Sequence, residues 1–89
     1  MQKYREQIAG LDRAILEALN QRIHLVRQLR DHKTAQGLGF HDAAQEDRLM
    51  GHLRQANQGP LPDEGLREIF SLILAWTKRG AVPEGPQGD

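Results

Sequence analysis

A long, uninterrupted helical pattern occupies the first 36 residues of this 89-residue chain. The segment contains no proline and a single glycine, Gly10. Apolar residues recur in it mostly every three or four positions, the spacing of one face of an α-helix. They are Tyr4, Ile8, Leu11, Ile15, Leu19, Val26 and Leu29. The pattern predicts a single helix of about 35 residues.

The length of this first helix constrains the rest of the fold. At roughly 1.5 Å per residue it would extend about 50 Å, whereas a compact domain of this size has a diameter of about 30 Å. The helix must therefore overhang its own domain, and its apolar face continues through the overhang. We predict that a second copy of the chain covers this face in a helical homodimer. The alternative is a fray or break of the helix near Gly10.

Two shorter helices are predicted after the first. The second is expected over residues 42–57 and the third over residues 62–79, just before Gly80. The remaining residues, 81–89, are rich in proline and glycine and are expected to form a disordered tail. The sequence thus predicts an all-α, three-helix chain with one domain over residues 1–80.

Composition excludes several classes of function. The chain has no cysteine, so neither disulfides nor thiolate chemistry are available. The longest apolar run, IFSLILAW, is too short to cross a bilayer, which predicts a soluble, cytoplasmic protein with no membrane partner. Twelve basic and twelve acidic residues balance, which argues against a nucleic-acid partner. A helix-turn-helix DNA binder is left as a distant alternative.

Two cations interrupt the apolar face of the first helix. Arg22 and Lys33 are eleven residues apart, three turns plus about 20°, so they lie nearly in line. Charges turned toward a core are costly unless anions meet them. Either internal acids such as Asp42 and Glu46 pair with them, or their charged ends reach water, or they form a pocket for a ligand with several negative groups. Arg5 is turned by roughly 100° from Arg22 and could join only from a partner chain.

The stretch HDAAQED, residues 41–47, lies between two helical segments. It lacks a ligand spacing typical of metal sites, so no metal is expected there. Asp42 followed three residues later by Gln45 is a variant of the capping box, which favours a helix start. Glu46 falls one turn in, where it can face the cations. Ser71 has no nearby general base, so nucleophilic catalysis has no good candidate.

The segments together resemble a known family. From about Tyr4 to Thr77 the chain is similar to the all-helical, AroQ-class chorismate mutases. The similarity is carried by YREQIAGLDRAILEALNQR at 4–22, Lys33, GLGFHDAAQEDRLM at 37–50 and NQGPLPDEGLREIFSLIL at 57–74. The last segment is especially similar to small mutase domains fused to or associated with the first enzyme of the shikimate pathway. The resemblance implies an intertwined homodimer with two active sites, in which the long first helix spans both subunits.

The resemblance also implies an activity. The family rearranges chorismate, a dianion, to prephenate by a Claisen-type shift without a cofactor or metal. By resemblance, Arg22 would bind one carboxylate and Arg5 from the other subunit the second. Lys33 would bridge a carboxylate and the ether oxygen, on which negative charge builds. Catalysis would come from positioning and electrostatic stabilisation.

Other positions of the family site are also identifiable. Asp42 and Glu46 match positions that line the pocket, with Glu46 taking the substrate hydroxyl. Thr77 stands where a small or hydroxyl residue lies near a substrate carboxylate. Two positions depart from the pattern: Gln45 replaces a common arginine, and Ala81, expected beyond the third helix, replaces a glutamine that donates to the ether oxygen.

These departures predict a mutase that is weak alone and improved by a partner enzyme of the shikimate pathway. Lys78 and Arg79 are expected to be solvent-facing charges that complement the helix dipole, rather than substitutes for the missing glutamine. Two other functions stay open. One is an isochorismate pyruvate lyase, and the other is a non-catalytic, regulatory domain that binds chorismate-derived acids.

Overall fold

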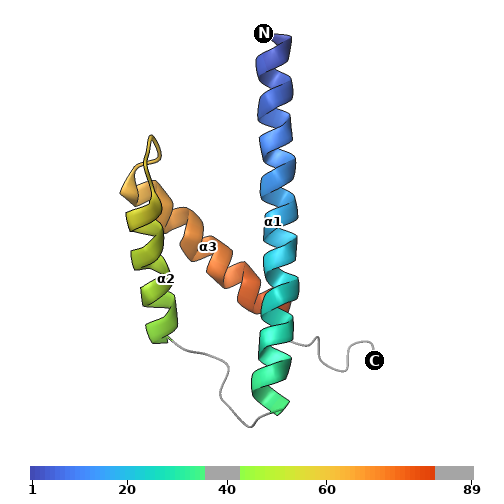
Figure 1. Cartoon of the computed structure of the whole chain (residues 1–89), viewed down its shortest axis with the longest axis vertical. Coiled ribbons are helices and arrows are strands. Elements are labelled where there is room, and N and C mark those ends of the chain that lie inside the picture. The colour runs from blue at the N-terminus through green and yellow to red at the C-terminus, as the bar shows by residue number, and fades with distance from the viewer. Residues whose placement is uncertain (36–42, 82–89) are drawn as a thin grey trace.

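The computed structural model describes residues 1–35 and 43–81, with the backbone alone for residues 33–35. This part of the chain contains three helices and no strands (Figure 1). They are α1 (Gln2–Ala35), α2 (Ala43–Ala56) and α3 (Asp63–Ala81). The prediction of an all-α, three-helix chain is confirmed. No helix in the described ranges is both long and apolar enough to cross a membrane.

Helix α1 is continuous through Gly10, so the alternative of a break at that residue is wrong for this chain. It follows the longest axis of the molecule, along which the chain extends 52 Å (Figure 1). Nothing in its sequence opposes this, because the helix contains no proline and Gly10 is its only glycine. The predicted overhang is therefore present.

Helix α3 is the central packing element. It runs from the end of α2 to the C-terminal half of α1 and packs against both helices, whereas α2 packs against α3 alone among the described elements (Figure 1). The N-terminal half of α1 stands clear of α2 and α3 (Figure 1). One chain thus forms an open arrangement in which only the lower part of α1 is covered.

The buried core of one chain is correspondingly small. Within the described residues, only Leu66, Thr77 and Ala81 are buried. The radius of gyration is 16.2 Å, compared with about 12 Å for a compact domain of this length. The apolar face of the first half of α1 is exposed; its members, with 57–67% of their surface accessible, are Tyr4, Ile8, Leu11 and Ile15. A single chain does not cover the face that the sequence predicts to be buried.

The turn between α2 and α3 is fixed by one side chain. Asn57 Nδ2 donates a hydrogen bond to the carbonyl oxygen of Leu61 at 2.8 Å, and Asn57 Oδ1 accepts one from the Gly59 amide at 2.9 Å. Gly59 has a φ of 76°, in the left-handed region that favours glycine. The turn therefore directs α3 back across the molecule toward α1.

The end of α3 differs from the prediction. The sequence places it at Arg79, but the helix continues to Ala81, which is 1% exposed. Ala81 is therefore the last residue of the helix rather than the first of a tail, and the rest of the predicted tail, 82–89, lies outside the described residues. The reason lies in the contacts that this last turn makes with α1.

Candidate functional site

Arg22 and Thr77 join α1 to α3 at the centre of the candidate site. Arg22 Nη1 donates a hydrogen bond to Thr77 Oγ1 at 2.7 Å. The same hydroxyl donates to the carbonyl oxygen of Ile73 at 2.6 Å, so it is satisfied as both acceptor and donor. Thr77 is buried and Arg22 is half-buried. The structure brings together two residues that the sequence analysis placed in one site.

No acid within residues 1–35 and 43–81 neutralises the charge of Arg22. Among the described residues no carboxylate forms an ion pair with it, and its hydrogen-bond partner there is a neutral hydroxyl. No ion pair joins Glu46 to Arg22, and the carboxylate of Glu46 instead lies beside Lys78. A pairing of Glu46 with Lys33 would involve a side chain outside the described residues. Asp42, the other acid considered, lies outside the described residues. A half-buried guanidinium with no carboxylate partner in the described part of the chain favours an anionic ligand.

Glu46 and Lys78 connect α2 to α3 beside this pair. Lys78 Nζ lies 2.8 Å from Glu46 Oε2, with 43% of the lysine side chain and 30% of the glutamate side chain exposed. The prediction that Lys78 is merely solvent-facing is therefore wrong. Arg79, by contrast, is exposed and its guanidinium lies 4.5 Å from the centroid of the Trp76 ring. The two basic residues have separate environments.

The candidate site is thus a cluster from three helices: Arg22 of α1, Glu46 of α2, and Thr77 and Lys78 of α3. Its two contacts are linked through the backbone of α3, because Thr77 and Lys78 are consecutive residues. Thr77 reaches Arg22 and Lys78 reaches Glu46. Arg22 and Lys78 are cations and Glu46 is the one carboxylate among these four residues, so together they carry a net positive charge that suits an anion.

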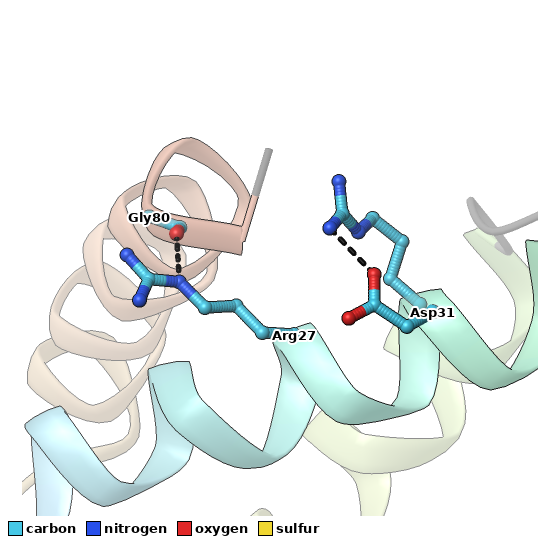
Figure 2. A network of polar contacts seen from close by, with 4 residues as sticks. Arg27, Asp31 and Gly80 are labelled. Atoms are coloured by element: carbon cyan, nitrogen blue, oxygen red, sulfur yellow. Dashed lines mark hydrogen bonds and ion pairs between the residues drawn. The ribbon is translucent and has the colours of Figure 1, made fainter. Parts of the chain in front are cut away.

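The last turn of α3 is held closely on α1. Arg27 Nε donates a hydrogen bond to the carbonyl oxygen of Gly80 at 2.6 Å (Figure 2). A Cβ built on Gly80 would lie 2.9 Å from Ile23 Cγ2, so the absence of a side chain permits the approach. These contacts explain why Gly80 does not end the helix. A glycine needed for packing has the same sequence signal as a glycine that terminates a helix.

Replacing Gly80 by alanine is expected to lower the free energy of unfolding by about 1–3 kcal/mol, because the new methyl group overlaps the stiff, branched side chain of Ile23. Urea denaturation measures the change. The matched control is Gly51→Ala in α2, where no atom lies within 4 Å of the added Cβ. That variant is expected to gain about 0.5–1 kcal/mol. Equal effects at both positions would contradict the proposed close approach.

Two of the predicted cations are not placed in the cluster. Arg5 is exposed, and it precedes Arg22 by 17 residues, about 25 Å along α1. One chain therefore does not bring its own Arg5 to the site, in agreement with the prediction that Arg5 could join only from a partner chain. The backbone of Lys33 lies in the last turn of α1, but its side chain lies outside the described residues. Its role stays a prediction.

The start of α2 is described only in part. The helix begins at Ala43, and Asp42, which belongs to the predicted capping box, lies outside the described residues. Gln45 is exposed, and its Oε1 accepts a hydrogen bond from Arg48 at 2.7 Å. Glu46 points from the first turn of the helix to α3. Among the described residues of the HDAAQED stretch, Glu46 is the one whose contacts place it in the cluster.

Arg30 is a further cation that the sequence analysis did not single out. Its side chain is 18% exposed and its Nη2 lies 2.7 Å from Asp31 Oδ1. Its Nε is buried and has no hydrogen-bond partner within the described part of the chain. Eight residues after Arg22, it is turned by about 80° toward the packed face of α1. The spacing from Arg22 was the sequence signal that could have indicated that Arg30 lies on the packed face of α1.

Metal binding finds no support in the described ranges. In residues 1–35 and 43–81, no group of three or more His, Asp or Glu side chains is arranged to hold an ion. The polar groups of the cluster are cations, a hydroxyl and one carboxylate. Such a set can bind and orient an organic anion and stabilise developing negative charge.

Comparison with known families gives a match over most of the chain. The family model described as chorismate mutase type II matches residues 4–81, which include all four residues of the cluster. None of the curated proteins compared with the chain gives a significant match.

Proposed function

Because the chain belongs to the chorismate mutase type II family, we propose that it is a chorismate mutase that rearranges chorismate to prephenate. The observation that carries this proposal is the half-buried guanidinium of Arg22. It is held by the Thr77 hydroxyl at 2.7 Å and has no carboxylate partner among the described residues. A substrate carboxylate would supply the missing negative charge.

The proposed reaction needs no nucleophile. Chorismate carries two carboxylates, and its ether oxygen gains negative charge as the C–O bond breaks. Arg22 binds one carboxylate, Lys33 bridges a carboxylate and the ether oxygen, and the Glu46 carboxylate accepts a hydrogen bond from the substrate hydroxyl. These roles follow from the resemblance of the residues to the family pattern. Preorganised cations stabilise the transition state more than the ground state, because charge on the ether oxygen develops only in the transition state.

We propose that the working form is a homodimer with two shared sites. The exposed apolar face of α1 and the open shape of one chain support a second copy as its cover. In such a dimer the overhanging half of α1 would carry the partner subunit's Arg5 to the second substrate carboxylate. The site would be incomplete in a single chain.

The activity of the chain alone is proposed to be low. Ala81 replaces the family glutamine that donates to the ether oxygen, and it is buried in the last turn of α3. A methyl group cannot donate a hydrogen bond to the ether oxygen. Loss of one such donor costs about a hundredfold or more in rate. A partner enzyme of the shikimate pathway that improves the geometry of the site would compensate.

Ala81 also favours a second candidate, a non-catalytic domain that binds chorismate-derived dianions. Purified protein incubated separately with chorismate and with isochorismate distinguishes the functions. Prephenate from chorismate is the expected result. Salicylate and pyruvate from isochorismate would indicate the lyase instead. Calorimetric binding of prephenate without turnover of either substrate, with or without a partner enzyme, would indicate the regulatory domain.

A further inference from the structure

The ion pair between Lys78 and Glu46 joins α2 and α3 at the edge of the candidate site, and the family pattern described above assigns no role to Lys78. We infer that Lys78 is a positioning residue of the reaction, which orients the Glu46 carboxylate toward the substrate. The inference rests on the proposed function, because it takes Glu46 as the group that meets the substrate hydroxyl.

The first argument for this role is the location of the ion pair. Lys78 Nζ reaches Glu46 Oε2 at 2.8 Å, and the neighbouring Thr77 holds Arg22 at 2.7 Å. The last turns of α3 therefore contact a charged side chain on each of the two other helices, Arg22 of α1 and Glu46 of α2. Ion pairing takes one carboxylate oxygen of Glu46, and the second oxygen can accept a hydrogen bond from the substrate.

The second argument is the solvent exposure of the ion pair. Both side chains are partly solvated, with 43% of Lys78 and 30% of Glu46 accessible. Ion pairs in such surroundings contribute little to the stability of a fold. A loss of activity without a loss of stability would therefore indicate a role in the site.

The chain contains a matched control pair. Arg54 Nε lies 3.3 Å from Asp63 Oδ1, and it also joins α2 to α3, at the opposite ends of these helices. Its side chains are 61% and 51% exposed. It has the same chemistry and connects the same two elements, but it is not part of the Arg22 cluster.

The first experiment compares Lys78→Met, Lys78→Arg and Arg54→Met in kcat/KM for chorismate and in thermal midpoint. Lys78→Met is expected to lose about tenfold to a hundredfold in kcat/KM, since small misplacements of a positioned group have effects of this size. Its midpoint should stay that of the wild type. Lys78→Arg should retain most activity, and Arg54→Met should match the wild type. Equal kcat/KM for Lys78→Met and Arg54→Met would overturn the inference.

A double-mutant cycle with Glu46→Gln separates positioning from direct contact with the substrate. If Lys78 acts through Glu46, adding Lys78→Met to Glu46→Gln should cause little further loss. The same fold loss in both backgrounds would overturn the inference, because Lys78 would then act on the substrate itself. Absence of turnover by the wild type, with and without a partner enzyme of the shikimate pathway, would instead refute the proposed function, and the inference with it. Turnover by the wild type with no effect of Lys78→Met refutes the inference alone.

Discussion

Replacing Arg22 by alanine is expected to lower kcat/KM for chorismate by about a hundredfold to a thousandfold, the effect of removing one preorganised charged donor from a transition state. Arg22 is half-buried and bound to Thr77, so its guanidinium is fixed before the substrate arrives. The alanine variant retains neither the charge nor the geometry. Loss of chorismate absorbance at several substrate concentrations measures the change.

Arg13→Ala is the control for this substitution. Arg13 is exposed and lies nine residues before Arg22, about 180° around the same helix. It should keep the wild-type kcat/KM. Circular dichroism should show the same helix content for both variants. A folded Arg22→Ala protein with wild-type kcat/KM would contradict the assignment of the pocket.

The second large effect is expected on the exposed face of α1. Changing both Ile8 and Ile15 to glutamate should convert a dimer into a monomer and abolish turnover. Each isoleucine contributes about 1.5–3 kcal/mol when buried, and the new carboxylates resist burial without partners. In one chain both residues are 57% exposed, so their loss should not harm the contacts of α3 with α1. Sedimentation equilibrium measures the mass.

Asn20→Glu adds the same kind of charge at an exposed position on another face of α1. This control should sediment as a dimer and keep its activity. A wild-type protein that sediments as a monomer, or a doubly substituted protein that is still dimeric, would show that this face of α1 is not the interface.

Helix α1 could be predicted because its signal is local and long. The apolar spacing runs from Tyr4 to Leu29, about seven turns, and no proline interrupts the segment. The structure places the helix at Gln2–Ala35, against a prediction of 1–36. That Arg22 and Thr77 belong to one site was predictable only through the family resemblance, which did not predict the hydrogen bond between them. These residues are 55 positions apart, and periodicity gives no distance between helices.

The end of α3 could not be predicted, because tertiary contacts determine it. Gly80 is a stop signal by propensity, yet Arg27 binds its carbonyl and Ile23 leaves no room for a side chain. The ion pair of Lys78 with Glu46 was missed for a related reason. Basic residues in the last turn of a helix are usually explained by the helix dipole, and only the position of α2 gives Lys78 its partner, Glu46.

The central claim is that two chains together form a site that rearranges chorismate, and subunit mixing tests it most directly. Arg5→Ala and Arg22→Ala proteins, each expected to keep at most about a hundredth of the wild-type activity alone, are unfolded together and refolded, and mass spectrometry confirms mixed dimers. Random pairing makes about half of the dimers mixed, each with one intact site of two, so activity should return to about a quarter of the wild-type value. Mixed dimers that convert chorismate no faster than either parent would contradict the claim.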